Sequence, residues 1–219
     1  MRKPSILAGA FCAALLCVSV GAQQAAPGDS GKKDVKGLSP RASAADYQSH
    51  AQAGTVTIAA DLAGHGVPTA DGVFENENYT IVEVGLFGPA GSHLNVSFKD
   101  FSLRVNGKKA LIPAVPYESV FGALKDPEWV PPGGVQKESG NGVSTGGGNQ
   151  SDPPAPVRMP MNLRLLMEQK VAKAALPEGD RALPGAGLLF FSQGGKTSNL
   201  RSVELVYSGA AGKATLPLQ

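Results

Sequence analysis

Short apolar segments with a period of two, separated by turns that contain Gly and Pro, recur along this chain of 219 residues. Residues 55–62 are an example, because Val56, Ile58 and Leu62 fall on one face of an extended chain and Thr57 on the other. This alternation is typical of a strand that buries one side. Several such strands joined by short turns predict an antiparallel structure and argue against regularly alternating strands and helices.

One strand is predicted to lie in the middle of the structure. Residues 79–87 are apolar on both faces, with Val84 on one and Ile81 on the other. A strand that is buried on both sides is central in its sheet. Three later segments are also predicted to be strands: 187–191, 201–207 and 213–218.

A change of phase and a turn motif mark the region between these strands. Residues 94–105 alternate, but the phase slips at 99–100, which predicts a bend or bulge there. The Asn-Gly pair at 106–107 tolerates positive φ at both positions and predicts a type I′ hairpin. The returning strand is then expected over 108–112.

The remaining segments are predicted to be helices or loops. Ser39 could cap a short helix over 40–52. Residues 63–78 are rich in Gly, Pro, Asp, Glu and Asn, which predicts a loop or an irregular edge. A helical turn is expected at 118–125. Apolar residues at helical spacing over 163–175, including Leu166, predict one longer helix.

The fold class that follows is mainly β: an antiparallel β-sandwich with one packed helix. We expect the centre between its sheets to hold apolar side chains from several strands, and Trp129 to close one edge. The expected centre consists of Val82, Val84, Phe101, Leu103, Phe190 and Leu205.

Both cysteines, Cys12 and Cys17, lie in an N-terminal segment with the features of an export signal. A basic start precedes an apolar run over 6–20, and small residues at 20–22 allow cleavage before Gln23. We therefore expect residues 1–22 to be a cleaved signal peptide and the protein to be periplasmic or extracellular. It would carry neither disulfide bonds nor a lipid anchor.

The rest of the chain is predicted to form one domain from residues 39–130 and 158–219. Residues 23–38 are expected to be a flexible tether and 131–157 a low-complexity disordered insertion, because both lack large apolar side chains. Beyond residue 22 the chain has 18 basic and 18 acidic residues. This balance gives no electrostatic reason to expect nucleic acid or an anionic membrane as a partner.

Motifs that could carry catalysis lack their structural context. A G-x-S-x-G string at 142–146 lies inside the predicted insertion, with no strand before it and no helix directly after it. The three histidines do not have the spacing of a metal-ligand pair. We therefore expect no catalytic, cofactor-binding or metal-binding residues.

The segment around the single tryptophan has the most distinctive composition. Asp126 and Glu128 could act as an acid and base pair, as two carboxylates do in glycoside hydrolysis. We favour an anchoring role for Trp129, since one indole buries a large area. Alternatively, Tyr117, Phe121 and Trp129 could line a groove that binds a partner.

The strand strings carry a resemblance to known families. IVEVGLF at 81–87 and LNVSFKDFSLRVNG at 94–107 resemble bacterial extracytoplasmic immunoglobulin-like domains of the DUF4352 type. LKDPEW and LPEGDR are similar to strings in an uncharacterised family of exported acidobacterial proteins. The resemblance covers 39–130 and 158–218 and implies an immunoglobulin-like sandwich. It implies no catalytic residue, and the insertion and the helix depart from the DUF4352 pattern.

The sequence thus predicts a non-enzymatic, exported, immunoglobulin-like module of the bacterial cell envelope. We expect it to bind a protein or a polymer, without a cofactor, a nucleic-acid partner or a membrane span. Two alternatives remain open. The first is an envelope carbohydrate hydrolase that uses Asp126 and Glu128, and the second is a structural or assembly factor.

Overall fold

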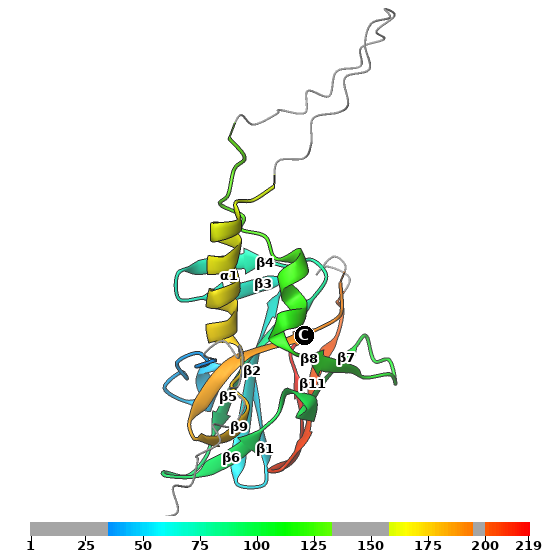
Figure 1. The fold of residues 1–219 in the computed structure, drawn as a ribbon. Coiled ribbons are helices and arrows are strands. Elements are labelled where there is room, and N and C mark those ends of the chain that lie inside the picture. The colour runs from blue at the N-terminus through cyan, green and yellow to red at the C-terminus, as the bar shows by residue number, and fades with distance from the viewer. Residues whose placement is uncertain (1–34, 133–157, 195–199) are drawn as a thin grey trace, which may run out of the picture. The chain divides into compact units, whose positions relative to one another are not determined.

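The computed structural model describes residues 35–132, 158–194 and 200–219. The fold of these residues is mainly β, with antiparallel strand pairs in a nearly closed eight-stranded sandwich and one α-helix (Figure 1). The predicted fold class is confirmed. The predicted signal peptide and nearly all of the predicted tether and insertion lie outside the described residues.

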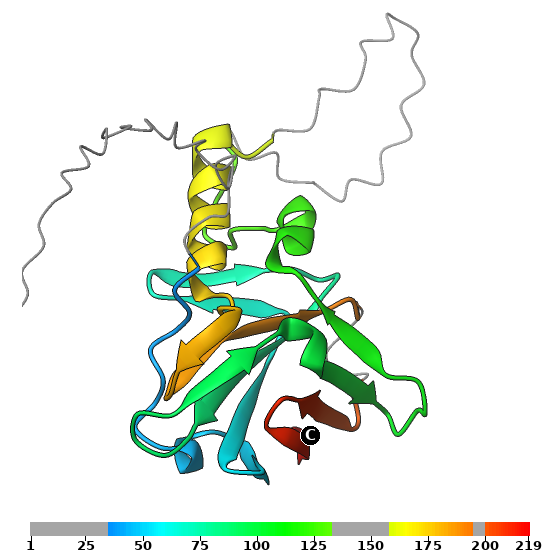
Figure 2. The same cartoon turned by 60° about the horizontal axis from the view of Figure 1, so that its bottom comes forward.

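The main sheet has eight strands in a hydrogen-bonded order that brings distant parts of the sequence together. In spatial order they are β1 (Ser49–Ala53), β2 (Val56–Gly64), β5 (Thr80–Phe87), β10 (Gly185–Phe191), β8 (Ile112–Val115), β7 (Phe101–Val105), β11 (Val203–Gly209) and β12 (Gly212–Pro217). β8 pairs with β10 on one side and with β7 on the other, so it joins the two walls of the sandwich. The outermost strands, β1 and β12, contact each other and nearly close the structure (Figure 2).

Smaller elements cover the ends of this sheet. Two short antiparallel pairs are the hairpin of β3 (Gly66–Thr69) and β4 (Gly72–Glu75), and the long-range pair of β6 (His93–Val96) and β9 (Gly179–Ala182). Three 3-10 helices are η1 (Ala44–Asp46), η2 (Phe98–Asp100) and η3 (Tyr117–Ala123). The single α-helix of the described residues is α1 (Met161–Ala174), as predicted within two residues.

The strand β5 is central, as its apolar residues on both faces predicted. It pairs with β2 on one edge and with β10 on the other. Val82 and Val84 belong to the cluster of buried side chains inside the sandwich, which we call the sandwich cluster. Ile81 belongs to a second cluster beneath α1, which we call the helix cluster. β5 therefore separates two hydrophobic cores.

The sandwich cluster contains most of the predicted centre. Val82, Val84, Phe101, Leu103 and Leu205 are all buried in it. The rings of Phe101 and Tyr207 lie 5.0 Å apart between their centroids.

Two residues predicted to lie in or at the edge of the centre between the sheets, Phe190 and Trp129, lie elsewhere in the structure. Phe190 is fully buried, but it belongs to the helix cluster, because its side chain lies on the opposite face of β10 from Leu189. Trp129 is half-buried and is not among the side chains of either cluster.

The helix cluster fixes α1 against the main sheet. Met167, Val171 and Ala174 of α1 pack with Val67, Phe74, Ile81, Val120, Leu188 and Phe190. The chain then runs directly from the helix onto the sheet, since the amide of Leu176 donates to the carbonyl of Leu188 at 3.0 Å. Leu166, predicted to face the core, is instead exposed.

The predicted helix over 40–52 is wrong. Only three residues form a 3-10 turn, and β1 begins at Ser49. The reason is a tight turn at Gly54, whose φ of 60° suits glycine, which lets β1 pair with β2. Tyr47 also packs flat against the sheet, where a side chain at Gly85 would lie 2.6 Å from its Cζ atom.

The prediction of a loop or an irregular edge over 63–78 is partly wrong, because this segment contains the β3–β4 hairpin. Val67 pairs with Phe74 in register, and both side chains are buried in the helix cluster. Residues 70–71 form the turn, and Gly72, with φ of 144°, begins β4 opposite Thr69. Burial under α1 thus stabilises β3 and β4, although their sequences alone do not indicate strands.

The predictions around the Asn-Gly pair are partly confirmed. Asn106 and Gly107 have φ of 52° and 65°, as a type I′ turn requires. The returning strand, however, begins at Ile112, which pairs with Leu103. The intervening residues 108–111 form an exposed loop rather than a strand. The predicted phase slip is confirmed, since η2 separates β6 from β7.

The contact between Gly187 and the end of α1 gives a stability prediction. A Cβ at Gly187 would lie 2.6 Å from the Leu176 nitrogen and 2.9 Å from the Ala175 carbonyl carbon, and neither backbone atom can rotate away. Gly187→Ala should therefore lower the free energy of unfolding by at least about 1–3 kcal/mol, as overpacked substitutions do.

Denaturant melts of the purified protein would measure this change. Gly122→Ala is the matched control, because nothing lies within 4 Å of a Cβ at that position. The control should stay within about 0.5 kcal/mol of wild type. Equal stabilities for the two variants would show that the helix does not join the sheet at Gly187.

Candidate functional site

Two of the three aromatic residues predicted to form a groove lie together on η3. The rings of Tyr117 and Phe121 meet edge to face with centroids 5.8 Å apart, and both side chains are half-buried against the helix cluster. Burial, and then a hydrogen bond to Glu118, raise the pKa of the Tyr117 hydroxyl. A short turn positions the third residue, since the amide of Trp129 donates to the carbonyl of Asp126 at 3.2 Å.

Polar contacts from two sides hold η3 in place. The buried side chain of Asn76, which follows β4, donates to the carbonyl of Val120 at 2.7 Å. From α1, the guanidinium of Arg164 donates to the carbonyl of Phe121 at 2.9 Å. Val120 itself is fully buried. These contacts make η3 and α1 one rigid support.

An apolar surface extends from this support into solvent. Six large hydrophobic side chains are exposed in the part of the chain that the structure describes, and five of them lie on α1, on the β3–β4 hairpin or on the chain after η3. We call these five the helix-end surface. They are Val73 (53% exposed), Val130 (74%), Met161 (70%), Leu165 (47%) and Leu166 (47%).

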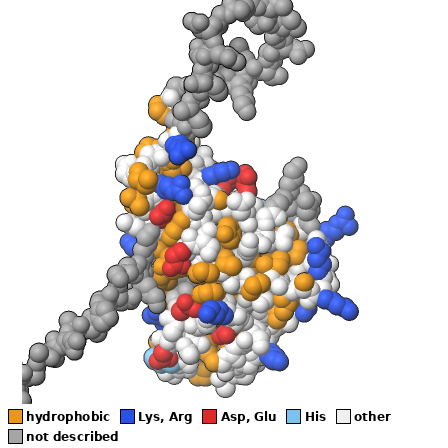
Figure 3. Space-filling model, turned by 45° about the vertical axis from the view of Figure 1, so that its right-hand side comes forward, with side chains coloured by type: hydrophobic (Ala, Val, Ile, Leu, Met, Phe, Trp, Pro, Cys, Tyr) orange, Lys and Arg blue, Asp and Glu red, His pale blue; other side chains and the backbone are white. Residues whose placement is uncertain are grey.

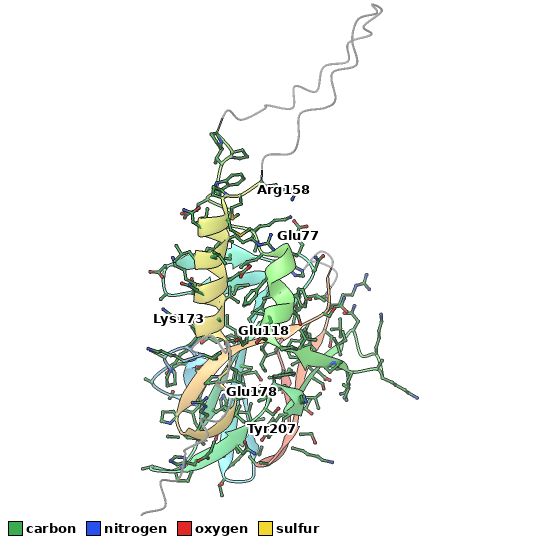
Figure 4. All side chains as sticks on the ribbon, viewed as in Figure 1. Glu77, Glu118, Arg158, Lys173, Glu178 and Tyr207 are labelled. Carbon is green, nitrogen blue, oxygen red and sulfur yellow. The ribbon has the colours of Figure 1, made fainter. Side chains whose placement is uncertain are left out.

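The elements that carry the helix-end surface are in contact with one another. α1 contacts β3 and η3, and the ammonium of Lys170 lies 3.4 Å from the carboxylate of Asp71 in the β3–β4 turn. A backbone bridge between Glu75 and Lys125 ties the chain after η3 to the same hairpin. Figure 4 labels Arg158 at the start of α1, where the described chain resumes after residue 132.

The sequence does not predict this surface. Helical spacing over 163–175 assigns Leu166 to the buried face, but the buried residues of α1 are Met167, Val171, Ala172 and Ala174. Apolar residues lie on two adjacent sides of the first half of α1, so helical spacing alone does not show which side is buried. The signal that could have found the surface is the excess of apolar residues in the first half of the helix, where Met161 and Leu165 lie four residues apart.

Asp126 and Glu128, the two carboxylates of the hydrolase alternative, lie in one short turn. The carboxylate of Asp126 accepts a hydrogen bond from the amide of Glu128 at 2.9 Å, which forms an Asx turn. Glu128 is exposed, and the neighbouring Lys125 lies 3.3 Å from Glu77. This arrangement supports a turn before Trp129.

A second pair of carboxylates, which the sequence does not single out, lies at the opposite side of the sandwich cluster. Burial, and then the charge of Glu178, raise the pKa of Asp100. Glu178 accepts from the hydroxyl of Ser97 at 3.0 Å and from the amide of Phe98 at 3.3 Å. Asp100 lies near Tyr207, whose pKa is raised mainly by burial; Figure 4 labels Tyr207 and Glu178. Asp100 can therefore keep its proton at a higher pH than an ordinary aspartic acid.

His65 borders a depression of about 400 Å³ between β2 and the C-terminal segment, with Gln48, Leu62 and Leu218 among its other lining residues. Its Nδ1 lies 2.6 Å from the carbonyl of Tyr79, which can only accept, so Nδ1 carries the proton. Its Nε2 is buried without a hydrogen-bond partner. No other histidine, cysteine or acidic residue joins it in a metal-binding group within the described residues.

No family model matches the chain, and neither a curated protein nor a solved structure matches it. The resemblance of its strand strings to immunoglobulin-like domains therefore stays a prediction.

The raised pKa of Asp100 gives a pH-dependent stability prediction. Folding disfavours the ionised carboxyl, so its cost is absent below the ordinary pKa of 3.8 and fully present once the pH exceeds the raised pKa. Asp100→Asn removes that cost. The melting temperature of Asp100→Asn relative to wild type should therefore rise with pH from strongly acidic to neutral conditions.

Thermal melts over this pH range would check the prediction. Glu178→Gln is the companion variant, and it should weaken the pH dependence without removing it, because burial is the larger cause. An Asp100→Asn protein that is less stable than wild type at neutral pH would contradict the assignment.

Proposed function

We propose that this protein is a non-enzymatic, exported, immunoglobulin-like module of the bacterial cell envelope, and that it binds a protein partner through the helix-end surface. The observation that carries the proposal is that Met161, Leu165 and Leu166 are exposed on α1, which Arg164 ties to η3, and that Val73 and Val130 are exposed on neighbouring parts of the chain. Several large hydrophobic side chains exposed on neighbouring elements favour an interaction site, whereas single exposed hydrophobic residues are ordinary.

A protein is favoured over a polymer because of the chemistry of this surface. Leu165, Leu166 and Met161 present aliphatic and thioether groups, and these suit the apolar centre of a protein interface. Asn162, Gln169 and Lys173 are also exposed on α1, where helical spacing places them between Leu165 and Leu166. Such a mixed face suits a non-obligate protein interface, which as a whole is only about as apolar as the rest of a protein surface.

The aromatic pair on η3 contributes the edge of this binding site. Tyr117 and Phe121 remain half-exposed, and Arg164 connects their helix to α1. Aromatic side chains are enriched at the energetic centres of interfaces because they bury large areas with few rotatable bonds. The proposed binding site is thus broader than a groove lined by three aromatic residues.

Export is proposed from the N-terminal sequence, and the sequence of the mature protein tests it. A protein purified from the envelope fraction should begin at Gln23, and both cysteines would then be absent from it. Mass spectrometry of the N-terminus would measure this. A product that retains residues 1–22, or a lipid-modified Cys17, would contradict the proposal.

A photo-crosslinking amino acid placed at Leu165 tests the binding surface in the living cell. We expect a discrete crosslinked product at this position and none at Thr215, an exposed control position on β12. Adding Leu166→Ser to the Leu165 derivative should reduce the product several-fold. It should change stability by no more than about 0.5 kcal/mol, since Leu166 is already exposed.

The same experiment has clear contrary results. Equal products at Leu165 and Thr215, or a product that Leu166→Ser leaves unchanged, would show that the helix-end surface is not the binding site. Circular dichroism of each variant would verify that the fold is retained.

A further inference from the structure

Three cations gather at the turn between β7 and β8, away from the elements that carry the helix-end surface. Lys108 and Lys109 are exposed in the loop after the Asn106–Gly107 turn, and Arg201 is exposed just before β11. We call Lys108, Lys109 and Arg201 the basic tip. Figure 1 shows this loop projecting from the sandwich, and Lys and Arg side chains gather along the corresponding edge in Figure 3.

Asn106 holds the two parts of the basic tip together. Its side-chain oxygen accepts from the amides of Arg201 at 2.8 Å and Ser202 at 3.2 Å, and its own amide donates to the carbonyl of Ser202 at 2.7 Å. The amide of Lys108 donates to the carbonyl of Val105 at 3.1 Å, which closes the turn. These bonds fix the backbone at Lys108 and Arg201, while the charged side chains of the basic tip are exposed to solvent.

The charge of the basic tip is not neutralised within the described part of the chain. On the adjoining strands β7 and β11, Arg104 and Glu204 form an ion pair at 2.8 Å, so the charge of Glu204 neutralises Arg104 and not the basic tip. Other lysines do have partners, since Lys125 pairs with Glu77 and Lys170 with Asp71. No ion pair involves Lys108, Lys109 or Arg201 among the residues that the structure places. The even charge balance of the whole chain thus conceals a local excess of about three positive charges.

One apolar side chain accompanies these charges. Leu111 is 42% exposed and follows the two lysines in the same loop, and it is the sixth exposed large hydrophobic residue of the described chain, the one outside the helix-end surface. Nucleic acids and other hydrophilic polyanions need cations but not an exposed leucine. Lysines beside an exposed aliphatic side chain are the composition of segments that bind at the interface of anionic membranes.

We propose that the basic tip, together with Leu111, docks the domain on the surface of an anionic phospholipid bilayer. The lysines and Arg201 contact the phosphate groups, and Leu111 enters the headgroup region. Each cation near such a surface changes affinity by about fivefold, so three give about a hundredfold preference for anionic over neutral lipid. This docking is independent of the proposed protein-binding surface, because the two surfaces share no residue.

Sedimentation with vesicles tests the proposal on the purified protein. The vesicles contain phosphatidylcholine alone, or phosphatidylcholine with about one third phosphatidylglycerol, at low salt and at about 0.5 M salt. We expect binding to the anionic vesicles at low salt, with loss of most of it at high salt and little binding to the neutral vesicles. The double variant Lys108→Glu with Lys109→Glu should bind at least about 25-fold more weakly.

Matched variants separate lipid docking from general electrostatic attraction and from polyanion binding. Lys213→Glu is the control, because Lys213 is exposed on β12 near the far end of β11 and should leave binding within about fivefold of wild type. Leu111→Ser should weaken vesicle binding but leave binding to soluble polyphosphate unchanged. Lys109→Gln, a milder change, repeats the test should the double variant fail to fold.

Several results would overturn the proposal. These are no binding to anionic vesicles at low salt, equal losses in Lys213→Glu and the tip variants, or vesicle binding that does not respond to Leu111→Ser. The last result, with equal binding to polyphosphate, would assign the basic tip to a soluble polyanion instead of a lipid surface.

Discussion

The rest of the structure depends on a pair of strands that is apolar on both faces. β5 and β10 pair along their whole length, and their side chains alternate between the two cores. Val82 and Leu189 face the sandwich cluster, whereas Ile81 and Phe190 face the helix cluster. Because one pair of strands forms a wall of both cores, the helix cannot leave the sheet without exposing the back of the sandwich to water.

This shared wall explains how a mainly β domain presents a helix. The only α-helix of the described chain is attached by burial of Met167 and Val171 and by the backbone contact at Leu176. Its other face is left for solvent or a partner. The helix-end surface and the basic tip then lie on elements that pack on the same frame, so one rigid domain would hold both contacts in a fixed relation. A module that joins an envelope protein to a membrane surface needs this property, and the two proposals together describe such a module.

The sequence predicts those parts of the fold whose structure follows from the residues of one short segment. Residues 81–87 are apolar on both faces and could only be a central strand, and Asn106-Gly107 could only be a turn with positive φ. The prediction of a helix over 40–52 is wrong because the deciding fact, pairing of β1 with β2, lies outside most of that segment. β9 has no buried residue and no alternation, so its pairing with β6 could not be predicted.

In the candidate site too, features set by one short segment could be predicted, whereas features that depend on contacts between distant segments could not. Tyr117 and Phe121 are four residues apart, and a helical turn is enough to bring their rings together. The helix-end surface depends on which side of α1 meets the sheet, and the prediction for Leu166 is wrong for that reason. The pairing of Asp100 with Glu178 joins residues from distant parts of the chain, and only the folded structure reveals it.

The most direct test of the shared wall is whether the two cores unfold together. Trp129 is the single tryptophan, is half-buried and follows η3, whose Val120 belongs to the helix cluster, so its fluorescence reports on the chain that leaves this cluster, while far-ultraviolet circular dichroism reports mainly on the strands. Phe190→Ala on the helix side and Phe101→Ala on the sandwich side should each lower the free energy of unfolding by about 3–5 kcal/mol. In both variants the two signals should change in one coincident transition. A Phe190→Ala protein whose fluorescence transition moves while its circular dichroism transition stays in place would show that the helix and the sandwich are separate units.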